Sequence, residues 1–341
     1  MLEIDGAYGE GGGQILRNAV ALSTLLKKPI KITNIRANRP NPGIKAQHYV
    51  AIKSIAELCD AEASGFEIGS SELEFKPGKI KGGRYKFEVG TAGSITLVFQ
   101  ACILALVNAK EPVTISLTGG TDVKWSPSWD YFEHVYVPLL KKMGVSVYPK
   151  LILRGYYPKG GGEAVITVKP TEKLKPLKFK DEQEFKKAAG KINISNLPEH
   201  IITRMRHKAI KTLLKNDIMS SIDVEQTTSL SPGVGLTLWT QTKDCLLGNA
   251  VLGEKGLGSE EVGMMAANNL LKEIGSEVNL DVYAFDQILP YMVLAKKEGA
   301  SSCKIRELTS HASTNMWLLQ QFFDVDFEAA QNEDSIDIKV F

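Results

Sequence analysis

A histidine, a glycine-rich turn and a basic loop carry the side chains of this sequence that are suited to chemistry. His311 lies in the run LTSHASTNMW, just before an expected helix for which Ser313 or Thr314 would be the N-cap. A helix N-terminus disfavours the imidazolium form and attracts phosphate, so a neutral imidazole there is placed to attack phosphorus and form a phosphoramidate. A lone histidine is more often a satisfied surface or core residue, and both interpretations stay open at this point.

The run GAYGEGGGQILRNAV (residues 6–20) places glycines directly before an apolar helical stretch. Glycine lets backbone N–H groups approach a phosphate, and the helix start adds a favourable dipole. Glu10 could then hold a divalent cation and Arg17 a phosphate, although a tight turn without any ligand explains the same glycines. The run does not match GxGxxG, and the chain has no GxxxxGKS/T sequence, so it is neither of these nucleotide-binding loops.

The run NIRANRPNPGIKAQH (residues 34–48) predicts a basic loop, because its two prolines keep it out of a helix. Arg36, Arg39 and Lys45 would lie on this loop. Guanidinium groups bind phosphate through paired donors, which suits an RNA end. A solvated basic loop without a ligand is the alternative.

The run RGYYPKGGGEA (residues 154–164) has three consecutive glycines before an expected strand. They indicate either a close approach of the backbone to another group or a structural bulge.

Three segments of the chain share one pattern of elements, which would position these side chains. Each opens with a small or polar turn and continues as an apolar helix, a short break and an alternating strand; they are residues 12–35, 93–120 and 286–308. A helix and two strands follow each segment, and a strand precedes the first helix. The pattern predicts an α/β (α+β) fold of three repeated units, each with two helices on one face of a four-stranded sheet.

Between the second and third units, residues 173–279 begin with a lysine-rich stretch and continue with strands and two helices. This length suffices for a small inserted α/β domain. We therefore predict a repeated-unit catalytic domain over residues 1–182 and 280–341, and an inserted small domain over residues 183–279.

The composition is that of a globular protein: 341 residues, 43% hydrophobic and 23% charged, with a formal net charge of +2. With so small a net charge, an RNA site must be a local patch. Four cysteines without a CxxC pair argue against zinc and disulfides. The N-terminus lacks a signal-peptide pattern and the longest apolar stretch is too short to span a bilayer, so we expect a cytoplasmic protein with no membrane partner.

Taken together, the sequence resembles the RNA 3′-terminal phosphate cyclase family along nearly its whole length, in the runs GEGGGQILR, IRANRPNPGIKAQH, SLTGGTDVKWSP, RGYYPKGGGEA and DQILP. The resemblance implies three units similar to the C-terminal domain of a bacterial translation initiation factor, plus an inserted domain. It implies that ATP, with Mg²⁺ or Mn²⁺, is used to convert an RNA 3′-terminal phosphate to a 2′,3′-cyclic phosphodiester through a histidine-AMP and an RNA-adenylate. RNA 3′-phosphate ends are the expected partner, with no obligatory protein partner.

The resemblance also implies roles for individual residues. The family's nucleophilic histidine falls on His311 and its metal-linked glutamate on Glu10. The phosphate- and RNA-binding positions fall on Arg17, Arg36, Arg39 and Gln47, and the ATP- and AMP-binding positions on Gln100, Tyr283, Asp286 and Gln287. Where the family usually has Val, Ile or Leu after RGxxPxGGG, this chain has Ala164, from which we expect an effect on packing alone.

Three other functions stay open. The chain could be a non-catalytic, cyclase-like protein of ribosomal RNA maturation, but such relatives lack the histidine. It could be an enolpyruvyl transferase, which has similar repeated units but not the RGxxPxGGG run. It could also adenylate another phosphorylated end, such as a DNA 3′-phosphate or a 5′-phosphate.

Overall fold

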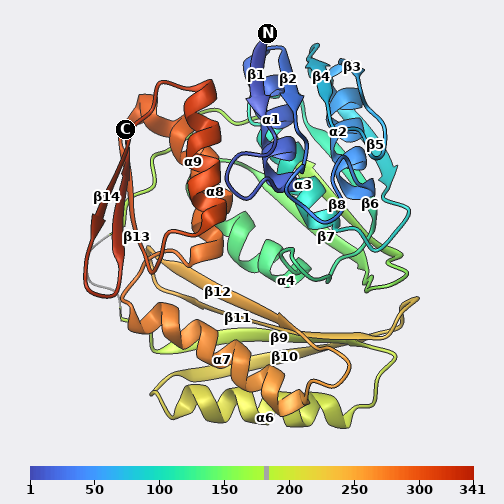
Figure 1. Cartoon of the computed structure of the whole chain (residues 1–341). Helices are drawn as coiled ribbons and strands as arrows, with labels where there is room; N and C mark the ends of the chain where they lie inside the picture. The colour runs from blue at the N-terminus through green and yellow to red at the C-terminus, as the bar shows by residue number, and fades with distance from the viewer. Residues whose placement is uncertain (180–183) are drawn as a thin grey trace.

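The computed structural model describes residues 1–179 and 184–341, which form four small β-sheets with helices packed against them (Figure 1). The predicted mixed α/β class is confirmed. The predicted boundary of the inserted domain at residues 182–183 lies outside the described residues.

The first sheet has the strand order β1-β2-β4-β3, with β1 parallel to β2 and the other neighbours antiparallel. Two helices lie between its strands in the sequence, and both bury an apolar face; α1 buries almost every residue from Ile15 to Leu25. The elements are β1 (Leu2–Asp5), α1 (Gly13–Leu26), β2 (Ile30–Thr33), α2 (Ala46–Cys59), β3 (Glu62–Ser64) and β4 (Leu73–Lys76).

The second sheet has the equivalent order, β5-β6-β8-β7, and the same parallel and antiparallel pairs. The single helix predicted near residues 131–143 is divided into α4, a π-helical turn η1 and α5. Pro138, which has no N–H to donate, is the second residue of α5, just after the π-turn. The elements are β5 (Gly83–Glu88), α3 (Ile95–Ala105), β6 (Val113–Gly119), α4 (Trp129–Tyr131), η1 (Phe132–Tyr136), α5 (Val137–Lys142), β7 (Val147–Leu153) and β8 (Gly162–Val168).

The third sheet has three strands among the described residues, in the order β13-β15-β14, where four were predicted. The free edge of β13 is met by the segment that leads into the inserted part: Ser302 N donates to the carbonyl of Leu177 (2.8 Å). The organisation as three repeated units stays a prediction. The elements are α8 (Val282–Leu294), η2 (Ala295–Glu298), β13 (Ser301–Ile305), α9 (Ser310–Phe322), β14 (Phe327–Gln331) and β15 (Ile336–Val340).

The fourth sheet, β10-β9-β11-β12, belongs to the inserted part of the chain and has its own apolar cluster, formed by residues between Phe185 and Val278. Figure 1 shows α6 and α7 on one face of this sheet and α4 on the other, in agreement with the contacts of α4 to β11 and β12. Strand β12 was not predicted. The elements are β9 (Lys187–Ser195), α6 (His200–Leu214), β10 (Met219–Thr227), β11 (Gly233–Gln241), β12 (Leu246–Leu252) and α7 (Ser259–Gly275).

The helices of the first three sheets pack on one another. Helix α1 contacts α2, α3 and α9, while α8 contacts α3 and α9. The start of α9 is therefore brought beside the start of α1, although the two lie at opposite ends of the sequence. Within residues 1–179 and 184–341, no helix combines the length and the apolar character needed to cross a bilayer.

Candidate active site

The glycine-rich turn before α1 is held against α9. The ring of Tyr8 stacks on Trp317, with centroids 3.8 Å apart and 10° between the planes. Glu10 N donates to Thr314 Oγ1 (3.5 Å), and Ser310 Oγ donates to the Glu10 carboxylate. The turn and the helix therefore form one rigid edge of the site.

His311 lies in the first turn of α9, not ahead of the helix. The N-cap is Thr309, whose hydroxyl accepts the N–H three residues later (3.1 Å), so the predicted cap at Ser313 or Thr314 is wrong. An earlier cap places His311 where the positive end of the helix dipole acts on it directly. The imidazole remains accessible, with 54% of the side chain exposed.

The hydrogen bonds of His311 fix which ring nitrogen is free. Nδ1 lies 3.1 Å from Gln14 Oε1 and 3.2 Å from Glu10 Oε2. The orientation of the Gln14 amide is set on its other side, because its Nε2 donates to Asp286 Oδ1 (2.5 Å). Nδ1 thus faces two acceptors and carries the proton of the neutral ring. Nε2 has no hydrogen-bond partner in the described part of the chain and keeps its lone pair.

Asp286 and Arg17 form the charged wall next to His311. Asp286 is oriented by Asn315, whose Nδ2 donates to its carbonyl (2.9 Å) and to Oδ1 (3.3 Å). Burial raises the pKa of Asp286, while the electrostatic interaction with His311, the hydrogen bonds from Gln14 and Asn315 and the charge of Arg17 oppose the rise. Burial lowers the pKa of Arg17 to about 10, and the charge of Asp286 opposes this fall. The Arg17 guanidinium makes no hydrogen bond within residues 1–179 and 184–341, so its donors are available to an anion.

A cavity of about 490 Å³ opens between α1, α3, α8 and the start of α9. This volume lies in the range of about 300–1,000 Å³ that is usual for small-molecule sites. Its inner wall is apolar and includes Leu104, Tyr136 and Tyr291, each nearly fully buried. Six of the predicted site residues line it: Arg17, Gln100, Tyr283, Asp286, Gln287 and His311.

The remaining predicted residues lie outside the cavity lining. Arg39 pairs with Glu10 (3.1 Å), next to His311. Arg36 instead donates to two carbonyls of its own loop, at residues 41 and 43 (2.6 and 3.0 Å), so it closes that loop. Gln47 accepts from the backbone N–H of Ser94 (3.3 Å) ahead of α3. The structure therefore brings Glu10 and Arg39 to His311, whereas Arg36 and Gln47 hold the surrounding backbone.

Glu10 was the predicted metal ligand, and its surroundings fit that role. A Mg²⁺ ion in an ATP-using site commonly binds through one or two carboxylates and the substrate phosphates. Glu10 supplies one partly exposed carboxylate beside a helix start that attracts phosphate. The ion pair with Arg39 is the contact that a cation would have to loosen.

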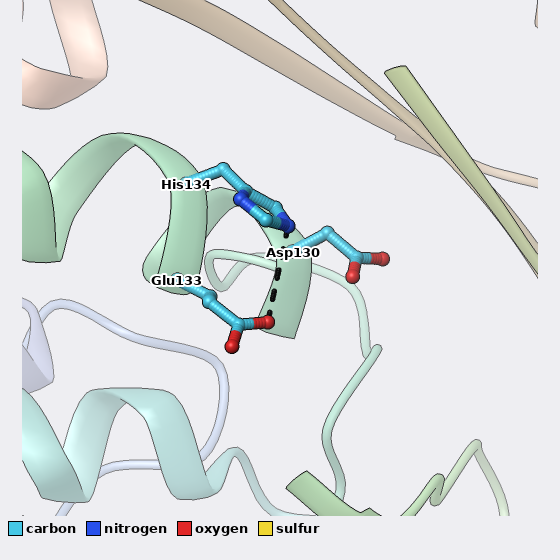
Figure 2. Close-up of side chains that lie close together, drawn as sticks. All are labelled: Asp130, Glu133 and His134. Atoms are coloured by element: carbon cyan, nitrogen blue, oxygen red, sulfur yellow. Dashed lines mark ion pairs between the residues drawn. The ribbon is translucent and has the colours of Figure 1, made fainter. Parts of the chain in front are cut away.

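A second group of metal-ligand type lies on α4 and η1, where His134 stacks on Trp239 of the inserted sheet. In the described ranges, the ligand atoms of Asp130, Glu133 and His134 lie within 4.8 Å of one another (Figure 2). Asp130, however, already accepts two hydrogen bonds from Arg154 (2.8 and 3.0 Å), and Lys191 Nζ is 3.7 Å away. Two cations beside the group oppose a third positive charge, so we assign the cluster to the contact between the two parts of the chain.

The run RGYYPKGGG takes part in that contact. Arg154 is 1% exposed and pairs with Asp122 (3.1 Å), Asp130 (2.8 Å) and Glu225 (2.8 Å). Burial lowers the pKa of Arg154, but the charge of Asp122 and the hydrogen bond to Glu225 outweigh it, and the pKa lies above its ordinary value. Because Glu225 belongs to β10, this guanidinium joins the inserted sheet to the rest of the protein.

Sequence reasoning missed several residues that shape the site. Gln14 links His311 to Asp286, and Asn315 orients Asp286; both stand inside quoted runs, GGGQILR and STN, but nothing local marks their partners. His48 is buried behind the turn, where its Nδ1 accepts from the backbone N–H of Lys45 (3.2 Å). Burial, followed by the charge of Arg17, lowers the pKa of His48 to about 3, so this histidine is neutral.

Comparison with known proteins identifies a family for this chain. The family described as RNA 3′-terminal phosphate cyclase matches residues 8–329. The chain belongs to this family. It is 44% identical to the RNA 3′-terminal phosphate cyclase of Methanosarcina barkeri and 42% identical to that of Methanosarcina acetivorans, each over 100% of both chains. It is 43% identical to the protein of that name from Pyrococcus furiosus, over 96% of this chain and 95% of the relative.

Proposed function

We propose that this protein is an ATP-dependent RNA 3′-terminal phosphate cyclase in which His311 carries the adenylyl group. Family membership supports the activity. The observation that carries the role of His311 is its hydrogen bonding: Nδ1 is bound to Glu10 and Gln14, while Nε2 is free at the edge of a cavity of nucleotide size.

The first step joins AMP to the enzyme. Nε2 of His311 attacks the α-phosphorus of ATP, a P–N bond forms, and the bond from the α-phosphorus to the bridging oxygen breaks to release pyrophosphate. The acceptors at Nδ1 stabilise the positive charge that the ring gains. The helix dipole of α9 and the free donors of Arg17 offset the phosphate charge. A Mg²⁺ or Mn²⁺ ion held by Glu10 would neutralise charge on the pyrophosphate.

The second and third steps transfer AMP and close the ring. An oxygen of the RNA 3′-phosphate attacks the adenylyl phosphorus, and the P–N bond breaks to return the free imidazole. The neighbouring 2′-hydroxyl then attacks the 3′-phosphorus and loses its proton, and AMP leaves with the bridging oxygen. The product is a 2′,3′-cyclic phosphodiester, formed without contacts to base edges.

Incubation with α-labelled ATP and Mg²⁺ tests the proposal. We expect an acid-labile, alkali-stable label on the protein that is discharged by an RNA 3′-phosphate. His311→Ala should abolish labelling, while His207→Ala, which changes an exposed histidine on α6, should label as wild type does. Equal labelling of His311→Ala and wild type refutes the role of His311. A wild-type protein that binds RNA but takes no label would favour the non-catalytic alternative.

A further inference from the structure

Trp125 is an exposed aromatic side chain at the mouth of the active-site cavity. It is 95% exposed and lines the same cavity as His311. It makes no ring stacking and no cation contact within residues 1–179 and 184–341. Folding therefore gains almost nothing from this indole, although tryptophan is normally among the more buried residues.

The backbone at Trp125 is strained as well as exposed. Its φ angle is +59°, in the left-handed region that bulky residues rarely adopt. Such a conformation costs free energy and persists only where the surrounding structure enforces it. Here that cost holds a large aromatic side chain in solvent at the cavity that His311 also lines, which points to a ligand.

The loop that carries Trp125 is anchored on both sides. Ser126 Oγ donates to the carbonyl of Val123 (2.9 Å), and the buried Thr96 of α3 donates to the carbonyl of Pro127 (2.8 Å). Lys124 pairs with Glu254 (2.5 Å), just after β12 of the inserted part. The indole is therefore presented by a fixed loop, so little conformational entropy is lost when a flat ligand packs on it.

The position of Trp125 favours the second substrate over ATP. The enclosed part of the cavity has its own apolar wall at Leu104, Tyr136 and Tyr291, which can take the adenine. Once AMP is bound there, the RNA end must reach the nucleophile from outside, past the exposed rim. Aromatic side chains bind single-stranded nucleic acid by stacking on its bases, whatever their identity.

We propose that Trp125 is a stacking platform for the base of the 3′-terminal nucleotide of the RNA. The proposal rests on the proposed function, because it requires a terminal 3′-phosphate at His311. It adds a binding residue for the RNA that acts through the face of the base and not through its edges.

The test separates the two substrates. Enzyme-AMP formation is measured with labelled ATP alone, and transfer is then followed with an RNA 3′-phosphate that ends in an intact or an abasic nucleotide. For Trp125→Ala we expect a KM for ATP within about twofold of wild type and a KM for intact RNA raised about 5- to 150-fold. With the abasic RNA, the KM of wild type should rise by a similar factor. Trp125→Ala should raise the KM for this RNA no further.

Three further variants complete the design. Trp125→Phe should retain most of the affinity for intact RNA, and Trp125→Gly, which suits the positive φ, should behave as Trp125→Ala does. Tyr148→Ala removes an exposed aromatic side chain on β7, away from the cavity, and should leave both substrates unchanged.

An equal effect of Trp125→Ala on intact and abasic RNA overturns the proposal, as does a loss confined to ATP. If wild type takes no label from ATP, the proposed function fails by itself. The stacking proposal is then decided by equilibrium binding of the two RNAs, where it fails if wild type binds both equally.

Discussion

Replacing Arg154 should be among the most damaging single changes outside the active site. Its guanidinium is 1% exposed and contacts two carboxylates that are themselves fully buried, Asp122 and Asp130, as well as Glu225. Arg154→Met keeps much of the volume but leaves these carboxylates without their main partner. Removing one member of a buried ion pair costs about 3–5 kcal/mol, a large part of a total stability of about 5–15 kcal/mol.

The loss should depend on pH. Burial raises the pKa of Asp122, and the charge of Arg154 opposes that rise in the native protein. Without Arg154 the pKa of Asp122 rises further, so the folded state binds more protons than the unfolded chain does. Stability of the variant then falls as pH increases. We expect the variant to lose more unfolding free energy relative to wild type at pH 8 than at pH 5, measured by urea denaturation with circular dichroism and fluorescence.

Two variants test the reasoning behind this magnitude. Arg154→Met combined with Asp122→Asn and Asp130→Asn removes the stranded charges and should recover much of the lost stability. Arg204→Met breaks a solvent-exposed pair with Glu260 and should change stability little. The buried-charge reasoning is refuted if Arg154→Met loses no more unfolding free energy than Arg204→Met does at pH 8. It is also refuted if Arg154→Met loses as much unfolding free energy at pH 5 as at pH 8.

Two further predictions concern the turn before α1. Gly13→Ala should destabilise the protein by about 1–3 kcal/mol, because a Cβ at this position would overlap His48 Nε2. Thermal unfolding should show this loss of stability. The double variant Gly13→Ala with His48→Ala should recover part of it. His48 contributes stability that is present above its ordinary pKa of 6.5 and is lost as pH falls toward 3, since only the unfolded chain takes up the proton there. His48→Gln should make the free energy of unfolding depend less on pH between these values. An unchanged pH dependence would contradict the assignment of His48 as a buried neutral histidine.

The sequence alone determined the features that depend on neighbours along the chain. The glycines before α1, the prolines of the basic loop and the apolar periodicity of the helices act within a few residues, so the α/β class and most elements were predictable from them. Local patterns failed where a distant group decided the outcome. Strand β12 pairs with β11, and at the edge of the third sheet the described residues place a contact between Leu177 and Ser302.

The site itself was decided by tertiary structure. The sequence offered His311, Glu10 and Arg17 as reactive side chains, but nothing in their local runs shows that α9 packs beside α1. That packing puts Glu10 within hydrogen-bond distance of a residue 300 positions away and joins Gln14 to Asp286 across 272 positions. Which nitrogen of His311 is free follows from these contacts. The physical reason is that residue types set what a side chain can do, whereas its protonation and partners depend on burial and neighbours that only the folded chain brings together.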